Sequence, residues 1–172
     1  MVWRRILTSL RHGPATEPAP VPGEETVAAL AAALEAASRR RLGRSLAIRH
    51  MDSGSCNGCE LEIHALSNVV YDLERLGLRF VASPRHADVL LVTGPLTRNL
   101  REALLLTRDA MPDPAWVVAI GDCAVDGGVF KGSYAVEGGP GAVLPVDLII
   151  PGCPPTPRQM LTGLRALIEA NA

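Results

Sequence analysis

The sequence predicts an α/β domain, in which an open sheet of parallel strands has helices on both faces. From residue 45 onward, short apolar runs alternate with longer amphipathic segments. Two of these runs, Val89–Thr93 and Trp116–Ile120, are almost continuously apolar, as is typical of parallel strands that are covered on both faces. Strands that alternate with helices favour parallel pairing. We expect a flavodoxin-like strand order, 2-1-3-4-5.

The elements follow one another as this fold requires. The expected strands are the apolar runs at 46–48 (ending near Met51), 78–82, 89–93, 116–120 and 148–150. The expected helices have apolar residues at spacings of three and four, over 59–76, 96–110 and 156–170. Residues 131–145 are too rich in glycine for a packed element, so we expect them to wrap around a partner.

An N-terminal helical extension, residues 1–44, is expected before the flavodoxin-like domain, residues 45–172. Its first 12 residues predict a short basic amphipathic helix, which suits docking onto a partner subunit or, alternatively, a frayed terminus. Residues 13–25 are proline-rich and predict an extended linker. Residues 26–41 are alanine-rich and predict a further helix.

Composition excludes several classes of function. The chain has 172 residues with 17 basic and 18 acidic side chains, and only 3% of its residues are aromatic, so no nucleic-acid partner is expected. A glycine-rich nucleotide motif is absent, so no nucleotide is expected. The sequence also lacks an apolar run of about 18 residues and a secretory signal, which predicts a cytoplasmic protein.

Four cysteines are the most informative residues, and all lie in glycine- or proline-rich loops: Cys56, Cys59, Cys123 and Cys153. Three of these loops follow predicted strands, and Cys59 lies in the first turn of the next helix. Because parallel strands present their carboxyl ends at one edge of the sheet, where such folds bind ligands, we expect the four thiols to converge there. In a cytoplasmic chain, this pattern indicates metal or redox chemistry.

The spacing favours a [4Fe–4S] cluster over zinc, because structural zinc sites usually combine two short Cys-x-x-Cys pairs and this chain has only one. Neighbouring glycines would let backbone amides approach the sulfur atoms. A zinc site remains an alternative, as do buried thiols or a redox disulfide between Cys56 and Cys59.

Five motifs resemble those of the small subunit of membrane-bound, energy-converting [NiFe] hydrogenases of the formate hydrogenlyase and hydrogenase-4 type. They are residues 52–62 (DSGSCNGCELE), 83–88, 93–97, 121–128 and 151–157 (PGCPPTP), and the resemblance covers about residues 45–170. The same family includes the NuoB/PSST subunit of complex I.

The resemblance implies a flavodoxin-like subunit that carries one [4Fe–4S] cluster on Cys56, Cys59, Cys123 and Cys153. It would transfer electrons between a ferredoxin-like iron–sulfur subunit and the active site of a hydrogenase-type large subunit, with no catalytic residue on this chain. Membrane subunits of the complex would hold it, peripherally, at the cytoplasmic side of the inner membrane.

This sequence differs from the family pattern at two places that affect the expected function. Complex I subunits carry adjacent cysteines where this chain has Asn57-Gly58 between Cys56 and Cys59, which favours the hydrogenase branch over a complex I-like subunit. Asp122 stands where hydrogenlyase relatives usually carry a small neutral residue, which leaves room for a related complex that lacks nickel–iron. A zinc-stabilised interaction module is a third possibility.

Glu60 allows two interpretations. It complements the dipole of the helix that it begins, or it takes a proton or hydrogen-bond role at the subunit interface, with His64 as its pair. His64 is disfavoured as a metal ligand, because four thiolates already supply every protein ligand that a [4Fe–4S] cluster needs.

Overall fold

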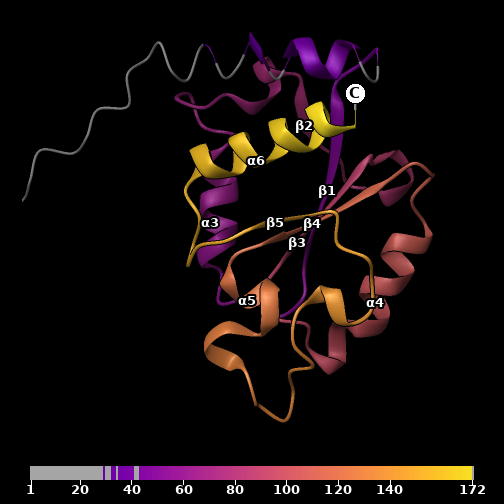
Figure 1. The fold of residues 1–172 in the computed structure, drawn as a ribbon, viewed down its shortest axis with the longest axis vertical. Helices are drawn as coiled ribbons and strands as arrows, with labels where there is room; N and C mark the ends of the chain where they lie inside the picture. Colours follow the sequence, from indigo (N-terminus) through magenta and orange to yellow (C-terminus); the bar gives the residue numbers. More distant parts are fainter. Residues whose placement is uncertain (1–28, 30–31, 34, 41–42, 172) are drawn as a thin grey trace, which may run out of the picture.

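A computed structural model describes residues 29, 32–33, 35–40 and 43–171 of the chain (Figure 1). Its centre is a sheet of five parallel strands in the order β2-β1-β3-β4-β5, which confirms the expected α/β class and the 2-1-3-4-5 order. The strands are β1 (Leu46–Asp52), β2 (Leu78–Phe80), β3 (Val89–Thr93), β4 (Trp116–Ile120) and β5 (Leu148–Ile150). The helix and linker expected at 1–12 and 13–25 lie outside the described residues.

Helices cover both faces of the sheet (Figure 1). On one face, α3 (Gly58–Ala65) and α6 (Pro157–Ala170) pack over a core that includes Ile63, Leu164 and the helical residue Ala37. On the other face, α4 (Arg98–Asp109) buries Leu104. The expected core face of α6 is confirmed, because all of its apolar members are buried: Met160, Leu161, Leu164, Leu167 and Ile168.

The helix expected over 59–76 is wrong in its second half. The side chain of Asn68 accepts hydrogen bonds from the backbone N–H groups of Val70 (2.8 Å) and Tyr71 (3.0 Å), and this turn replaces helical bonding. The helix α3 therefore ends at Ala65, and a short 3₁₀ segment, η1 (Leu73–Leu76), follows. Val69, which the helical pattern placed in the core, is 96% exposed.

The glycine-rich stretch 131–145 is also more ordered than expected. Its second half forms the 3₁₀ turn η4 (Pro140–Ala142) and packs on the sheet through Val143 and Leu144. Gly139 is buried against the backbone carbonyl groups of Ala124 and Val125, an approach that a side chain would prevent. This half of the stretch therefore packs against the domain core.

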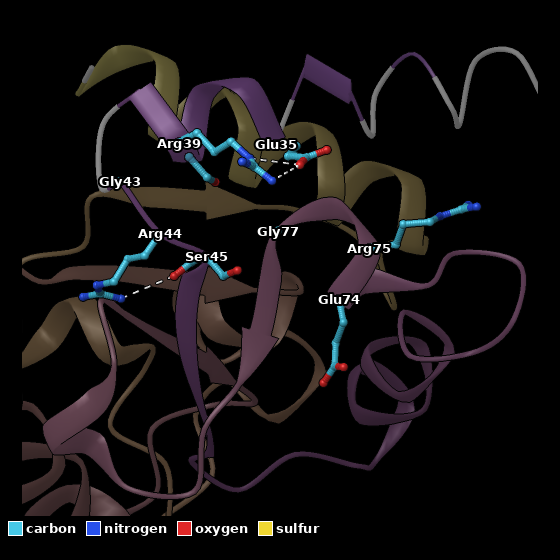
Figure 2. Close-up of a pocket in the computed structure, with 9 residues that line it drawn as sticks. Glu35, Arg39, Gly43, Arg44, Ser45, Glu74, Arg75 and Gly77 are labelled. Carbon is cyan, nitrogen blue, oxygen red and sulfur yellow. Dashed lines mark hydrogen bonds and ion pairs between the residues drawn. The ribbon is translucent and has the colours of Figure 1, made fainter.

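The amino ends of the strands carry their own polar contacts. Asp88, which is buried, accepts two hydrogen bonds from Arg44 (2.6 and 2.8 Å) and one from the backbone N–H of Ala47 (2.9 Å). A pocket of about 410 Å³ lies at this edge, and Figure 2 shows that the arginines lining it point in different directions. All three are paired, Arg39 with Glu35, Arg44 with Asp88 and Arg75 with Asp72, so they present no convergent cationic site.

Candidate metal centre

The four cysteines lie at the opposite, carboxyl edge of the sheet. Cys56 follows β1, and Cys59 lies in the first turn of α3. Cys123 lies in α5 (Asp122–Asp126), directly after β4, and Cys153 follows β5. Cys56 and Cys153 are exposed, whereas Cys59 and Cys123 are partly buried. All four are free thiols, so one edge of the sheet presents the whole cysteine content of the chain.

Glycines bring the cysteine loops into close contact. A Cβ atom at Gly121 would lie 2.6 Å from Sγ of Cys59 and 3.4 Å from the carbonyl oxygen of Gly152, so only glycine lets these three loops meet. A Cβ atom at Gly128 would lie 3.0 Å from Sγ of Cys123. At Gly58 a Cβ atom would lie 3.6 Å from Sγ of Cys56 and 4.0 Å from Pro154, which follows Cys153.

Two aspartates hold the loops in place. The Oδ1 atom of Asp52 accepts hydrogen bonds from the backbone N–H groups of Gly54 (2.7 Å) and Ser55 (2.6 Å), which fixes the turn before Cys56. The Oδ1 atom of Asp122 accepts a hydrogen bond from the backbone N–H of Gly152 at 2.8 Å. Asp122 therefore links the loop of Cys123 to that of Cys153, a structural role that its position in the sequence did not indicate.

The thiols influence one another electrostatically. Burial raises the pKa of Cys59 to about 12, and the negative charges of Glu60, Cys123, Cys56 and Cys153 contribute to the same shift. Burial also raises the pKa of Cys123, against a backbone hydrogen bond from Val129 that lowers it. Four thiolates this close together repel one another, so a positively charged group is needed to stabilise the deprotonated set.

The donor set fits an iron–sulfur cluster. Within the described residues, no three His, Cys, Asp or Glu side chains are arranged to hold a single metal ion. Thiolates around a cubane stand farther apart than thiolates around one ion, because iron and sulfide lie between them. Four free thiols from three connections of the sheet are the donors that such a cluster takes, and Gly121 and Gly128 leave the space beside two sulfur atoms free of side chains.

The partner of Glu60 differs from the one expected. Glu60 is buried, and its Oε1 atom lies 3.9 Å from Nε2 of His50, a residue of β1, whereas His64 is exposed. The same nitrogen of His50 lies 3.0 Å from Oγ1 of Thr93. Burial lowers the pKa of His50, and the carboxylate of Glu60 partly opposes that shift. Sequence reasoning missed His50; the only signal was a polar residue near the end of a strand next to a cysteine loop.

No helix in the described part of the chain has the length and apolar character needed to cross a bilayer.

Comparison with known proteins identifies relatives that are named as subunits of a formate hydrogenlyase and of a membrane-bound hydrogenase. Formate hydrogenlyase subunit 7 of Escherichia coli is 42% identical over 146 residues, which are 85% of this chain and 56% of the relative, so the chain spans little more than half of that protein. The "Probable membrane-bound hydrogenase subunit mbhJ" of Pyrococcus furiosus is 46% identical over 76% of this chain and 78% of the relative.

A solved structure agrees with these relatives. One chain in the structure of the membrane-bound sulfane sulfur reductase, an archaeal respiratory membrane complex, matches 80% of this chain with a TM-score of 0.67 and 32% identity, over 75% of its own length. Residues 56–167 match the family described as "NADH ubiquinone oxidoreductase, 20 Kd subunit". That match begins at the first cysteine and includes all four. The chain therefore belongs to the family of the 20 kDa subunit of NADH ubiquinone oxidoreductase, as a relative of hydrogenase and complex I-like respiratory subunits.

Proposed function

We propose that this chain is an electron-transfer subunit whose Cys56, Cys59, Cys123 and Cys153 hold one [4Fe–4S] cluster. The observation that carries the proposal is the meeting of all four cysteines, from three connections, at one edge of the sheet, with glycines beside their sulfur atoms at Gly58, Gly121 and Gly128. Membership of the family supports the same conclusion.

The four cysteines and the neighbouring glycines would have different roles in binding such a cluster. When bound, the cluster would accept and release one electron at a time. Cys59 and Cys123, which are partly buried, would bind it where the protein shields it from water. Cys56 and Cys153, which are exposed, would bind it where a partner can approach. Gly121 and Gly128 keep side chains out of the space beside the inner thiols.

The partner expected at this edge is the large subunit of a hydrogenase-type complex. Large apolar side chains are exposed close to the cysteines: Leu61 lies two residues after Cys59, and Val125 lies two residues after Cys123. Val129 is 80% exposed in the following turn. Exposed apolar side chains around a redox centre are typical of a surface that a partner covers. A ferredoxin-like subunit and membrane subunits complete the proposed complex, which would sit peripherally on the cytoplasmic face of the membrane.

The proposed redox partner is the nickel–iron site of that large subunit, and the hydrogenase relatives support this choice. A second candidate is a related respiratory complex without nickel–iron, and the match to a chain of the sulfane sulfur reductase favours it. A complex I-like quinone reductase is less well supported, because Asn57 and Gly58 separate the first two cysteines.

Exposure of the intact complex to hydrogen separates these candidates. The complex is purified anaerobically from cells, its nickel is measured, and it is placed under hydrogen without another reductant. The hydrogenase function is supported if hydrogen produces the EPR signal of a reduced iron–sulfur cluster and this signal is missing from a Cys123→Ala variant. If that signal appears with dithionite but not with hydrogen, and nickel is absent, the second candidate replaces the first. If the Cys123→Ala variant loses no signal, the proposal fails.

A further inference from the structure

Two carboxylates are buried in the described part of the chain, and they differ in their partners. Asp88 accepts hydrogen bonds from Arg44 and from the backbone N–H of Ala47. Glu60 is only 8% exposed, and neither of its carboxylate oxygens has a hydrogen-bond partner. An unpartnered buried carboxylate opposes folding, because the group loses its water and gains no donor in return. Packing alone does not explain a buried carboxylate without a partner, which points to a function of the group.

The position of Glu60 indicates what that function is. Glu60 directly follows Cys59 in the first turn of α3, at the carboxyl edge of the sheet. The side chain of His50 lies close to it, with 3.9 Å between Nε2 of His50 and Oε1 of Glu60. His50 is held in turn by Thr93 of the neighbouring strand, with 3.0 Å between Nε2 and Oγ1. Two adjacent strands thus present an imidazole to the carboxylate from inside the fold.

A negative charge in this position acts on electron transfer. Screening by water is weak for a buried group, so its field reaches neighbouring atoms with little loss. An electron added next to a fixed negative charge is disfavoured, and the reduction potential of the centre that accepts the electron falls. We propose that Glu60, oriented by His50, is the positioning residue that lowers the reduction potential of the centre held by Cys59. This inference rests on the cluster proposed above.

The test measures the potential itself. In the intact complex, Glu60→Gln removes the charge and keeps the shape of the side chain, while Glu74→Gln makes the same change at an exposed site at the opposite edge of the sheet (Figure 2). EPR-monitored redox titration should give a higher midpoint potential for Glu60→Gln. We expect a shift of at least about 59 mV, which is a tenfold change in the equilibrium constant of a one-electron couple. The Glu74→Gln variant should titrate like the wild type.

A double-mutant cycle tests the part played by His50. His50→Leu should raise the potential in the same direction as Glu60→Gln, because the carboxylate loses the group that orients it. Introduced into the Glu60→Gln variant, His50→Leu should cause no further shift. Additive shifts would show that His50 acts independently of Glu60 and would overturn its assignment as the orienting residue.

The outcomes separate this inference from the proposed function. If the wild-type complex has no signal that depends on Cys123, the cluster proposal fails. If the signal is present and Glu60→Gln titrates like Glu74→Gln, the cluster stands and the role of Glu60 is overturned. Should Glu60→Gln fail to assemble, the pair Glu60→Asp and Glu60→Asn replaces it. The Asp variant, which keeps the charge, should then have the lower potential of the two, and equal potentials overturn the inference.

Discussion

Asp122 and Gly152 connect the loops that carry Cys123 and Cys153. The Oδ1 atom of Asp122 accepts a hydrogen bond from the backbone N–H of Gly152 (2.8 Å), and the backbone N–H of Asp122 donates to the carbonyl oxygen of Gly152 (2.9 Å). The first of these two bonds depends on the aspartate side chain, so substitution can remove it and leave the second.

Loss of that side-chain bond should loosen the candidate site. We expect Asp122→Ala to lower the free energy of unfolding by about 1 kcal/mol, the usual effect of one hydrogen bond. The iron content of the purified complex should also fall, because Cys153 is less well positioned. Asp122→Asn keeps an acceptor oxygen and should remain close to the wild type in both measurements. Equal iron content in the Ala variant and the wild type would show that this link does not position the thiols.

Gly121 offers a sharper test, because the chain contains a matched control. Its backbone φ is +87°, and a Cβ atom there would lie 2.6 Å from Sγ of Cys59. Gly132 has a φ of +84°, and a Cβ atom there would meet nothing within 4 Å. Both Gly→Ala variants carry a similar backbone strain of about 1 kcal/mol or more. We expect only Gly121→Ala to lose bound iron, as measured by metal analysis; equal losses in both variants would attribute the effect to strain.

The contact between Arg44 and Asp88 at the amino edge should matter for stability rather than for redox chemistry. Asp88 is 7% exposed and is bonded to both terminal nitrogens of Arg44. We expect Asp88→Asn to lower the free energy of unfolding by about 2 kcal/mol in urea titration, because a charge-assisted pair is lost. Glu35→Gln, which breaks an exposed ion pair with Arg39, should change it by less than about 1 kcal/mol. Equal effects of the two variants would contradict this assignment.

Metal removal should reveal differences among the four thiols. The pKa of Cys59 rises from 9.0 to about 12, so at pH 8 its thiolate is about a thousandfold scarcer than for an unshifted thiol. The greater nucleophilicity of a more basic thiolate offsets part of this loss. After chelation under reducing conditions, we expect Cys59 to react with iodoacetamide at least about tenfold more slowly than the exposed Cys56 and Cys153.

The pH dependence of that reaction has a defined sign. Because the pKa of Cys59 is raised, the thiol stays protonated until the pH approaches 12, and its alkylation rate should keep rising throughout the range from pH 8 to 11. Peptide mass spectrometry measures the rate at each cysteine. A Cys59 rate equal to that of Cys56 at pH 8 would contradict the burial of its thiol.

The sequence predicts the sheet well because its signals are local and consistent. The apolar runs at β3, β4 and β5 match the strands of the structure residue by residue. In each case the run is short, continuous and followed by glycine or proline, which leaves no competing helical pattern. Parallel topology then places the three following loops at one edge, which is why the meeting of the cysteines could be foreseen.

Features that depend on tertiary contacts could not be foreseen in the same way. Val69 continues the apolar spacing of α3, yet the turn stabilised by Asn68 ends the pattern and leaves this side chain in solvent. The link from Asp122 to Gly152 joins residues 30 positions apart, and His50 reaches Glu60 from another element. A single sequence contains no periodicity that records such contacts.

The central claim is tested most directly by anaerobic analysis of the intact complex and of four variants, each with Ser in place of one cysteine: Cys56, Cys59, Cys123 and Cys153. Our account predicts that the wild type contains both iron and acid-labile sulfide. Each variant should lose the same reduced-state EPR signal. Zinc in place of iron, or a signal that persists when any one of the four thiols is replaced, would contradict it.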